Sequence, residues 1–265
     1  MKTLINMEFY KLLRLESYKC LFAICFLIAL SPAKQQLMGI VYTTGYEWFC
    51  VVQLMGGMLV IPVCFFSADY VASDYSNCTF TSSICCGFTR EQIFGAKVIV
   101  YLVGLMPLFL VNTITGTITR TIQYGFGAEL HSTTFVRMAI ALIYYILTYP
   151  LVIGMLFFLC AIVTQNRTAT IGFGIGTVQL LGSVTSSIGY RIGMAKDSFG
   201  KKIGEWLFQF NPLYQIHSLI KPQIFKQIPL SQFVLSTVVW FLFLFMISMY
   251  VFKRSDFKSN GRDHF

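Results

Sequence analysis

Few residues in this chain could serve as acids, bases or metal ligands. The three histidines, His131, His217 and His264, all lie outside the long apolar segments. The eleven acidic residues lie at the edges of those segments or between them. Intramembrane proteolysis or a proton relay would need paired acids, a Ser/His pair or metal ligands at bilayer depth. The sequence therefore predicts no catalytic site and no metal site.

Motifs that bind nucleotides or activate a serine are also missing from the sequence. It contains no G-x-x-x-x-G-K-[ST] loop and no G-x-S-x-G turn, which are the signatures of a P-loop and a nucleophile elbow. The eight cysteines include no C-x-x-C pair, and we interpret them as small apolar residues between helices. We expect the chain to carry no cofactor, so any energy from ATP must come from a partner.

The composition indicates that the chain lies in a membrane. Of 265 residues, 56% are apolar and 12% are charged, about half of the roughly 25% charge typical of soluble domains. The apolar residues form long unbroken runs, which favours membrane-spanning helices. The net charge of +9 then indicates loops facing an anionic membrane surface, and no nucleic-acid partner is expected.

Six apolar segments are long enough, or nearly so, to cross the membrane as helices. They cover residues 20–30, 49–68, 98–118, 138–163, 170–188 and 233–252. The fold class predicted is an all-α polytopic membrane protein with one transmembrane domain over residues 1–265.

Six spans place both termini on one side of the membrane. That side would carry eleven of the 20 basic residues, and the other side nine, of which six lie in the single loop 189–230. Basic residues far from a span have little influence on orientation. We therefore expect both termini, including the tail 253–265, to be cytoplasmic.

The first nineteen residues show helical periodicity. Four apolar residues share one helical face: Ile5, Phe9, Leu12 and Leu13. Lys11 and Arg14 lie on the opposite face, which is typical of an amphipathic helix in the membrane interface. A plain basic flank to the first span explains the same pattern nearly as well.

The loop 189–230 contains a stretch that is too apolar for a solvated connection and too interrupted to span the membrane. Trp206 and Tyr214 suit an interface, and Asn211-Pro212 favours a turn between them. We interpret this stretch as a re-entrant pair of short helices, with a surface amphipathic helix as the alternative.

The polar segment 69–97 lies between the second and third predicted spans. Asp74 is a candidate N-cap, and Gly87 a candidate C′ residue after a helix of about three turns. Thr89 could cap the next helix, with Arg90 and Lys97 near lipid headgroups. Such a helix could dock a soluble partner, although a solvated connection without a partner fits equally well.

At this segment the chain resembles the permease subunits of ABC-2 type transporters, especially small six-span bacterial exporters of bacitracin-like and lantibiotic-like peptides. The residues that match the family's first cytoplasmic loop are Asp74, Tyr75, Thr79, Gly87, Thr89, Arg90, Ile93 and Lys97. Asp74 stands where the family usually has glutamate, and Cys78 where it has glycine. The residues Glu8, Lys11 and Arg14 resemble the family's opening elbow helix, and Asn211-Pro212 its extracellular insertion.

The resemblance implies a subunit of an exporter in the bacterial plasma membrane. Two permease subunits, identical or related, would pair through their second and fifth spans, where Gly172 and Gly176 suit close helix packing. Each would seat on a separate ATPase subunit that holds ATP and magnesium, with the segment around Asp74 as the coupling helix. Its cargo would be an amphipathic peptide or a lipophilic antimicrobial.

Two other functions stay open at this point. The first is a non-transporting immunity or sensor subunit that detects peptides at the membrane, and the second, disfavoured by the missing acids and histidines, is an intramembrane enzyme.

A possible substrate path follows from helical spacing within the second and fifth predicted spans. Gln53 and Gly57 lie one turn apart on one face, as do Gln179 and Ser183. A buried amide at bilayer depth needs a partner, so these residues could contact cargo. Interhelical hydrogen bonding by the same residues is the alternative.

Overall fold

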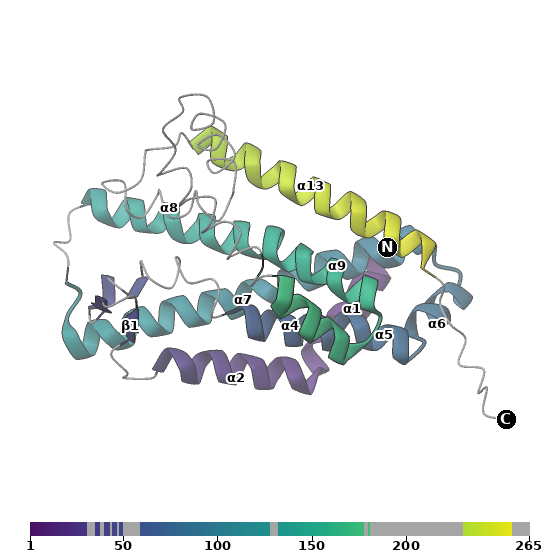
Figure 1. Ribbon diagram of the computed structural model, residues 1–265, viewed down its shortest axis with the longest axis horizontal. Helices are drawn as coiled ribbons and strands as arrows, with labels where there is room; N and C mark the ends of the chain where they lie inside the picture. The colour runs from purple at the N-terminus through teal and green to yellow at the C-terminus, as the bar shows by residue number, and fades with distance from the viewer. Residues whose placement is uncertain are drawn as a thin grey trace.

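The computed structural model is an elongated bundle in which the long helices run along the longest axis of the molecule (Figure 1). It describes residues 1–30, 35–37, 40–42, 44–46, 48–49, 59–127, 132–177, 180 and 230–255. Short strands β1 (Gln35–Leu37) and β2 (Ile40–Tyr42) pair antiparallel. Apart from this hairpin, the regular elements of the described chain are helical, which confirms the predicted helical fold class.

The chain begins with two helices, α1 (Lys2–Arg14) and α2 (Glu16–Leu30), separated by Leu15 in an extended conformation. The residues that α1 buries are Leu4, Glu8 and Leu12, which recur every fourth position. Phe9 is exposed on this helix. The predicted apolar face is therefore wrong in part. The acidic residue Glu8 lies on the buried face, because its carboxylate pairs with Lys97 inside the protein.

Helix α7 (Arg90–Tyr124) is the central element and packs against α1, α2 and α13. It starts in a capping box in which the Thr89 hydroxyl accepts from the Gln92 amide and the Gln92 side chain accepts from the Thr89 amide. This confirms Thr89 as the predicted cap. At about 1.5 Å per residue its 35 residues measure roughly 52 Å, more than the thickness of a bilayer with its headgroups.

In the part of the chain that the structure describes, two helical segments contain π-helical turns. Helix α4 (Val60–Ser67) continues through η2 (Ala68–Ala72) into α5 (Ser73–Ser76), and α8 (Ser132–Tyr149) continues through η3 (Pro150–Gly154) into α9 (Met155–Thr164). Pro150 has no amide hydrogen to donate, which favours the wider turn. The Tyr101 hydroxyl donates to Gly154 O at 3.1 Å and lies 2.5 Å from Ser67 Oγ. Tyr101 thus links the last residue of α4, directly before η2, to the last residue of η3.

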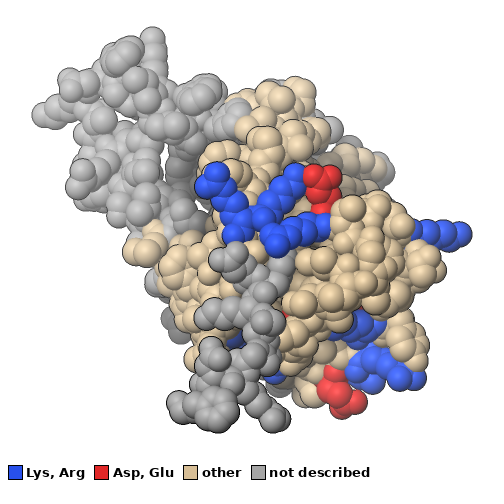
Figure 2. All heavy atoms as spheres, turned by 90° about the vertical axis from the view of Figure 1, so that its right-hand side faces the viewer, with Lys and Arg blue, Asp and Glu red and all other residues tan. Residues whose placement is uncertain are grey.

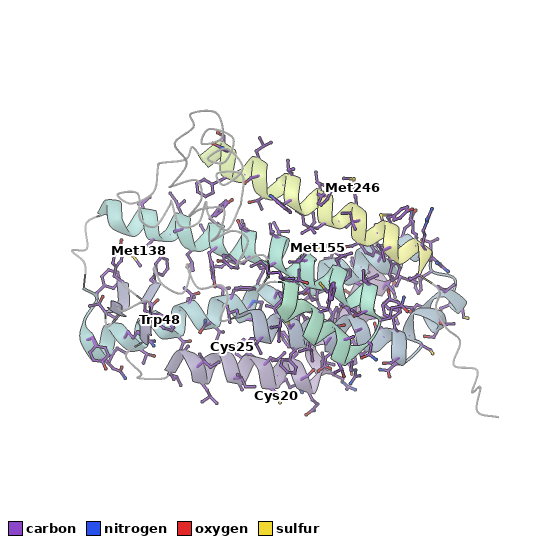
Figure 3. All side chains as sticks on the ribbon, in the orientation of Figure 1. Cys20, Cys25, Trp48, Met138, Met155 and Met246 are labelled. Atoms are coloured by element: carbon purple, nitrogen blue, oxygen red, sulfur yellow. The ribbon has the colours of Figure 1, made fainter. Side chains whose placement is uncertain are left out.

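Within the described residues, three helices are long and apolar enough to cross a membrane: Arg90–Tyr124, Met138–Thr164 and Ser231–Arg254, the last within α13 (Leu230–Arg254). They contain the third, fourth and sixth predicted spans, which are therefore confirmed as helices of membrane length. The surface supports the same conclusion. Helix α13 exposes Leu235, Phe243 and Met246 to more than half of their area, and an apolar face of this kind requires lipid or a partner. Figure 3 shows Met246 on the outer side of α13.

The other three predicted spans are not shown. Helix α2 has 15 residues, fewer than the roughly 20 that span a bilayer without help. The second and fifth predicted spans are described only in part, as Val60–Ser67 with η2 and as a helix over 167–177. The re-entrant stretch, with Trp206, Asn211, Pro212 and Tyr214, lies outside the described residues, and so do Gln53, Gly57, Gln179 and Ser183.

Candidate functional site

The segment α5–α6 lies at one end of the molecule, beside α1 and the last turn of α13 (Figure 1). We call this end the α6 end. Helix α6 (Thr79–Cys85) follows α5 after a turn in which Cys78 adopts a left-handed conformation, with φ 54°. One helix of about three turns was predicted here, and the structure has two short helices instead. The reason is that turn, which redirects the chain between Asn77 and Thr79.

Helix α6 ends in a Schellman motif. The Phe88 amide donates to Ser83 O at 3.3 Å and the Gly87 amide donates to Ile84 O at 2.9 Å. Gly87 has φ 91°, a conformation that is accessible to glycine at low cost. Gly87 is therefore confirmed as the predicted C′ residue.

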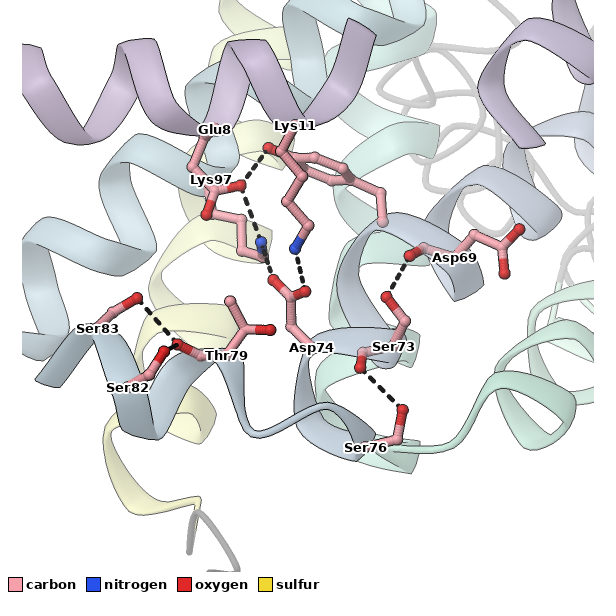
Figure 4. A network of polar contacts seen from close by, with 11 residues as sticks. Glu8, Lys11, Asp69, Ser73, Asp74, Ser76, Thr79, Ser82, Ser83 and Lys97 are labelled. Atoms are coloured by element: carbon pink, nitrogen blue, oxygen red, sulfur yellow. Dashed lines mark hydrogen bonds and ion pairs between the residues drawn. The ribbon is translucent and has the colours of Figure 1, made fainter. Parts of the chain in front are cut away.

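A buried ion network connects this segment to α1 and α7 (Figure 4). The network consists of Glu8, Lys11, Asp74 and Lys97, with the hydroxyl of Tyr70. Asp74 forms ion pairs with both lysines. Lys97 Nζ lies 3.1 Å from Glu8 Oε2, and the Tyr70 hydroxyl donates to the same oxygen at 2.8 Å. The prediction of Asp74 as an N-cap is wrong, because its carboxylate is used by the two lysines.

The network is neutral in sum, and three of its four charged side chains are almost closed to solvent, while that of Lys11 is 31% exposed. The side chains of Asp74 and Lys97 are each 1% exposed, and that of Glu8 11%. Two aromatic rings lie under the Lys97 ammonium, with Nζ 4.6 Å from the Tyr70 centroid and 5.2 Å from that of Phe80. Ring faces attract a cation, so they complete its surroundings.

The charges of the lysines decide the ionisation of Asp74. Burial by itself would raise the pKa of this carboxyl, but the positive charges of Lys97 and Lys11 hold the pKa below its usual value. Burial and the neighbouring Lys97 ammonium lower the pKa of Lys11. Both groups have a direct partner of opposite charge, so we infer that Asp74 and Lys11 are ionised at neutral pH.

The other side of α5–α6 faces α13. The Phe80 ring lies 5.2 Å from Phe252, and the Phe252 ring lies 5.5 Å from Phe94 of α7. Arg90 Nη1 donates to Lys253 O at 2.6 Å and to Ser255 O at 3.3 Å. Arg90 was predicted near lipid headgroups and, by resemblance, in ATPase coupling. The structure shows that its guanidinium binds carbonyls at the end of α13.

The outward surface of α5–α6 is polar and uncharged. Its exposed residues before Thr89 are Ser76, Asn77, Ser82, Cys85, Cys86 and Gly87. The hydroxyls of Ser82 and Ser83 donate to Thr79 O at 3.0 and 2.9 Å, which supports the first turn of α6. Tyr75 is turned inward, with its ring 4.8 Å from that of Phe80.

The predicted site residues separate into groups. Glu8, Lys11 and Asp74 meet in the ion network, whereas Arg14 is exposed and stacks on Tyr10 at 4.5 Å. Sequence reasoning missed Tyr70 and gave Lys97 no partner. A lysine at the very start of an apolar span was a usable signal, because a charge at that position needs a counter-ion.

No protein-family model matches the chain, and no curated protein matches it.

The described residues offer no group of histidine, cysteine or acidic side chains arranged to hold a metal ion. What the site can do is mechanical. A displacement of α5–α6 would be transmitted through the ion network to α1 and α7, and through Phe80 to α13.

Proposed function

We propose that the chain is the membrane-spanning permease subunit of an ATP-binding-cassette exporter, with ATP hydrolysed on a separate ATPase subunit. The carrying observation is the burial of Asp74 between Lys11 and Lys97, which ties a surface segment to two helices of the bundle. Residues Asp74, Tyr75, Thr79, Gly87, Thr89 and Arg90 then belong to the coupling segment, and α1 is the elbow helix.

The geometry supports this role in two respects. The outward face of α5–α6 carries small polar residues such as Asn77 and Ser82, which suits a close protein contact without a desolvated charge. Its inward face is anchored by buried charges, and removing one partner from such a set is costly. A segment anchored in this way moves with α1 and α7.

The proposed assembly contains a second permease subunit, identical or related, in the bacterial plasma membrane with the α6 end in the cytoplasm. An open groove runs along the helix over 167–177 and is lined by Thr164, Gly172, Phe173 and Gly176. A methyl group added at Gly172 or Gly176 would contact no atom of the described residues within 4 Å, so a second helix could approach there closely. The cargo proposed is an amphipathic peptide or a lipophilic antimicrobial.

Co-purification of the chain with a co-expressed ATP-binding-cassette ATPase subunit tests the docking surface. Ser82→Arg places a large charge on the exposed face of α6, and Ser231→Arg places the same charge on an exposed position at the start of α13. We expect the first variant to lower the recovered ATPase at least about ten-fold, the effect of roughly 1.4 kcal/mol, and the second to leave it unchanged.

Transport is then measured in proteoliposomes that contain both subunits, as ATP-dependent movement of labelled peptide. Equal ATPase recovery with both variants would contradict docking at α6. ATPase binding with no peptide-stimulated hydrolysis would instead favour the immunity or sensor function.

A further inference from the structure

The arginines whose side chains the structure describes fall into two classes. Three of them bind groups of the protein. Arg90 donates to carbonyls at the end of α13, Arg120 stacks on Trp48 at 3.4 Å and donates to Ala29 O, and Arg167 lies 3.8 Å from Asp69. The other two, Arg14 and Arg254, have a different environment.

Arg14 and Arg254 each stack on a tyrosine one helical turn earlier. The guanidinium carbon lies 4.5 Å from the Tyr10 centroid in α1 and 4.6 Å from the Tyr250 centroid in α13. Both tyrosines are 56% exposed. Within the described chain, neither guanidinium has a hydrogen bond or ion pair to another residue.

The stacked arrangement presets the guanidinium for an anion. Stacking on the ring fixes one face of the planar group and leaves its N–H edges open, and those edges match the oxygens of a phosphate. At the end of α13 the carbonyls Lys253 O and Ser255 O accept from Arg90, and no hydrogen bond from Arg254 to them is among the described contacts.

An exposed methionine extends each pair along its helix. Met246 precedes Tyr250 by one turn and is 62% exposed, and Met7 precedes Tyr10 by three residues and is 57% exposed. Each helix therefore presents an apolar side chain, an amphipathic ring and a cation in sequence. Along the membrane-length helix α13 this order matches the passage from acyl chain through interface to headgroup.

The position of the α13 stripe agrees with this order. Arg254 is the last residue of a membrane-length helix, and Arg14 is the last residue of α1. Figure 2 shows basic side chains gathered on the α6 end, with few acidic ones among them. Charge complementarity thus favours an anionic occupant.

We propose that the stripes Met7–Tyr10–Arg14 and Met246–Tyr250–Arg254 each bind one anionic phospholipid. The guanidinium holds the phosphate, the tyrosine ring lies at the headgroup boundary, and the methionine contacts the acyl chain. These sites do not depend on the transport function, since a sensor subunit would need them equally.

Native mass spectrometry of the full chain in detergent tests the proposal, with phosphatidylglycerol, phosphatidylcholine and inorganic phosphate as probes. We expect the wild type to retain phosphatidylglycerol in preference to phosphatidylcholine. Arg254→Gln and Arg14→Gln should each raise its apparent Kd about five-fold, which is the usual weight of one basic group at an anionic surface. Arg254→Lys should lose less than Arg254→Gln, because it keeps the charge but not the fork of donors.

Arg167→Gln is the matched control, because Arg167 is exposed, pairs with Asp69 and has no ring beneath it among the described contacts. Unchanged phosphatidylglycerol binding in both Gln variants would overturn the proposal. An equal loss in Arg167→Gln would overturn it as well, since the effect would then reflect net charge only. Displacement of the lipid by millimolar inorganic phosphate would assign the arginines to a free anion instead.

Discussion

The segment α5–α6 is held on its two sides by different chemistry. Towards α1 and α7 it is held by buried charges, with Asp74 between two lysines. Towards α13 it is held by the ring contact of Phe80 with Phe252, and Arg90, the first residue of α7, donates to backbone carbonyls at the end of α13. The first side depends on complete pairing, while the second consists of separate contacts, each of moderate strength.

This difference predicts how each side fails. Removing one member of a buried ion set leaves an uncompensated charge, which costs more than the set contributes. Removing one ring or one capping donor loses only that contact. The ionic side should therefore break as a unit and the α13 side in steps.

The largest effect is expected for Lys97→Met. This variant leaves two carboxylates with one lysine in a buried site, and we expect unfolding to become easier by about 3–5 kcal/mol. Denaturant unfolding in detergent, followed by tryptophan fluorescence, measures the change. The double variant Asp74→Leu/Lys97→Leu removes one charge of each sign and should cost less than Lys97→Met. A larger loss of stability in the double variant would show that Asp74 and Lys97 stabilise the fold through packing and not through their ion pair.

A smaller effect is expected on the α13 side for Arg90→Gln. The variant removes charged donors from Lys253 O and Ser255 O, and a hydrogen bond of this kind contributes about 1.5–3 kcal/mol. Faster amide hydrogen exchange in the last turn of α13 is the expected readout, with the ion network unaffected. Arg254→Gln is the control, because Arg254 lies at the same helix end but does not donate to Lys253 O or Ser255 O among the described contacts. Amide hydrogen exchange in the last turn of α13 should then stay as in the wild type.

Acidification separates the two sides further. Lys97 and Lys11 lower the pKa of Asp74 in the folded protein. The Asp74 carboxylate therefore stabilises the fold fully at any pH above its unfolded pKa of about 3.9. This contribution is lost as the pH falls through the lower pKa of the folded state. The slope from one such group is at most about 1.4 kcal/mol per pH unit. We expect Asp74→Asn to flatten the loss of stability below roughly pH 4. An identical acid transition in wild type and variant would remove Asp74 as its source.

The smallest effect concerns the turn that joins the two sides. Cys78 has φ 54°, a conformation that costs a residue with a Cβ about 1–2 kcal/mol. Cys78→Gly should therefore stabilise the fold by up to about 1 kcal/mol after the entropy of glycine is included. Cys85→Gly, within helix α6, is the control and should destabilise by a similar amount. Stabilisation by both would point to loss of the thiols rather than relief of the turn.

Local patterns in the sequence predicted several elements of this structure correctly. The cap at Thr89, the C′ glycine at Gly87 and three helices of membrane length all depend on residues within one or a few helical turns of each other. Helix α1 was predicted as a helix, but its buried face was not, since that face includes Glu8. Periodicity assigns faces by hydrophobicity, and it fails where an acid is buried against a distant cation.

By itself the sequence determined that this is a helical protein with helices of membrane length, because apolar run length and capping are local properties. Only the tertiary structure decided which charges meet. Glu8 and Lys97 are 89 positions apart, and Arg90 lies 163 positions from Lys253. The low content of charged residues, 12%, explains why the helices were predictable and the ion pairs were not. The apolar runs are easily recognised in such a sequence. Each charge buried in the bundle needs a partner, and only the packing of the helices supplies it.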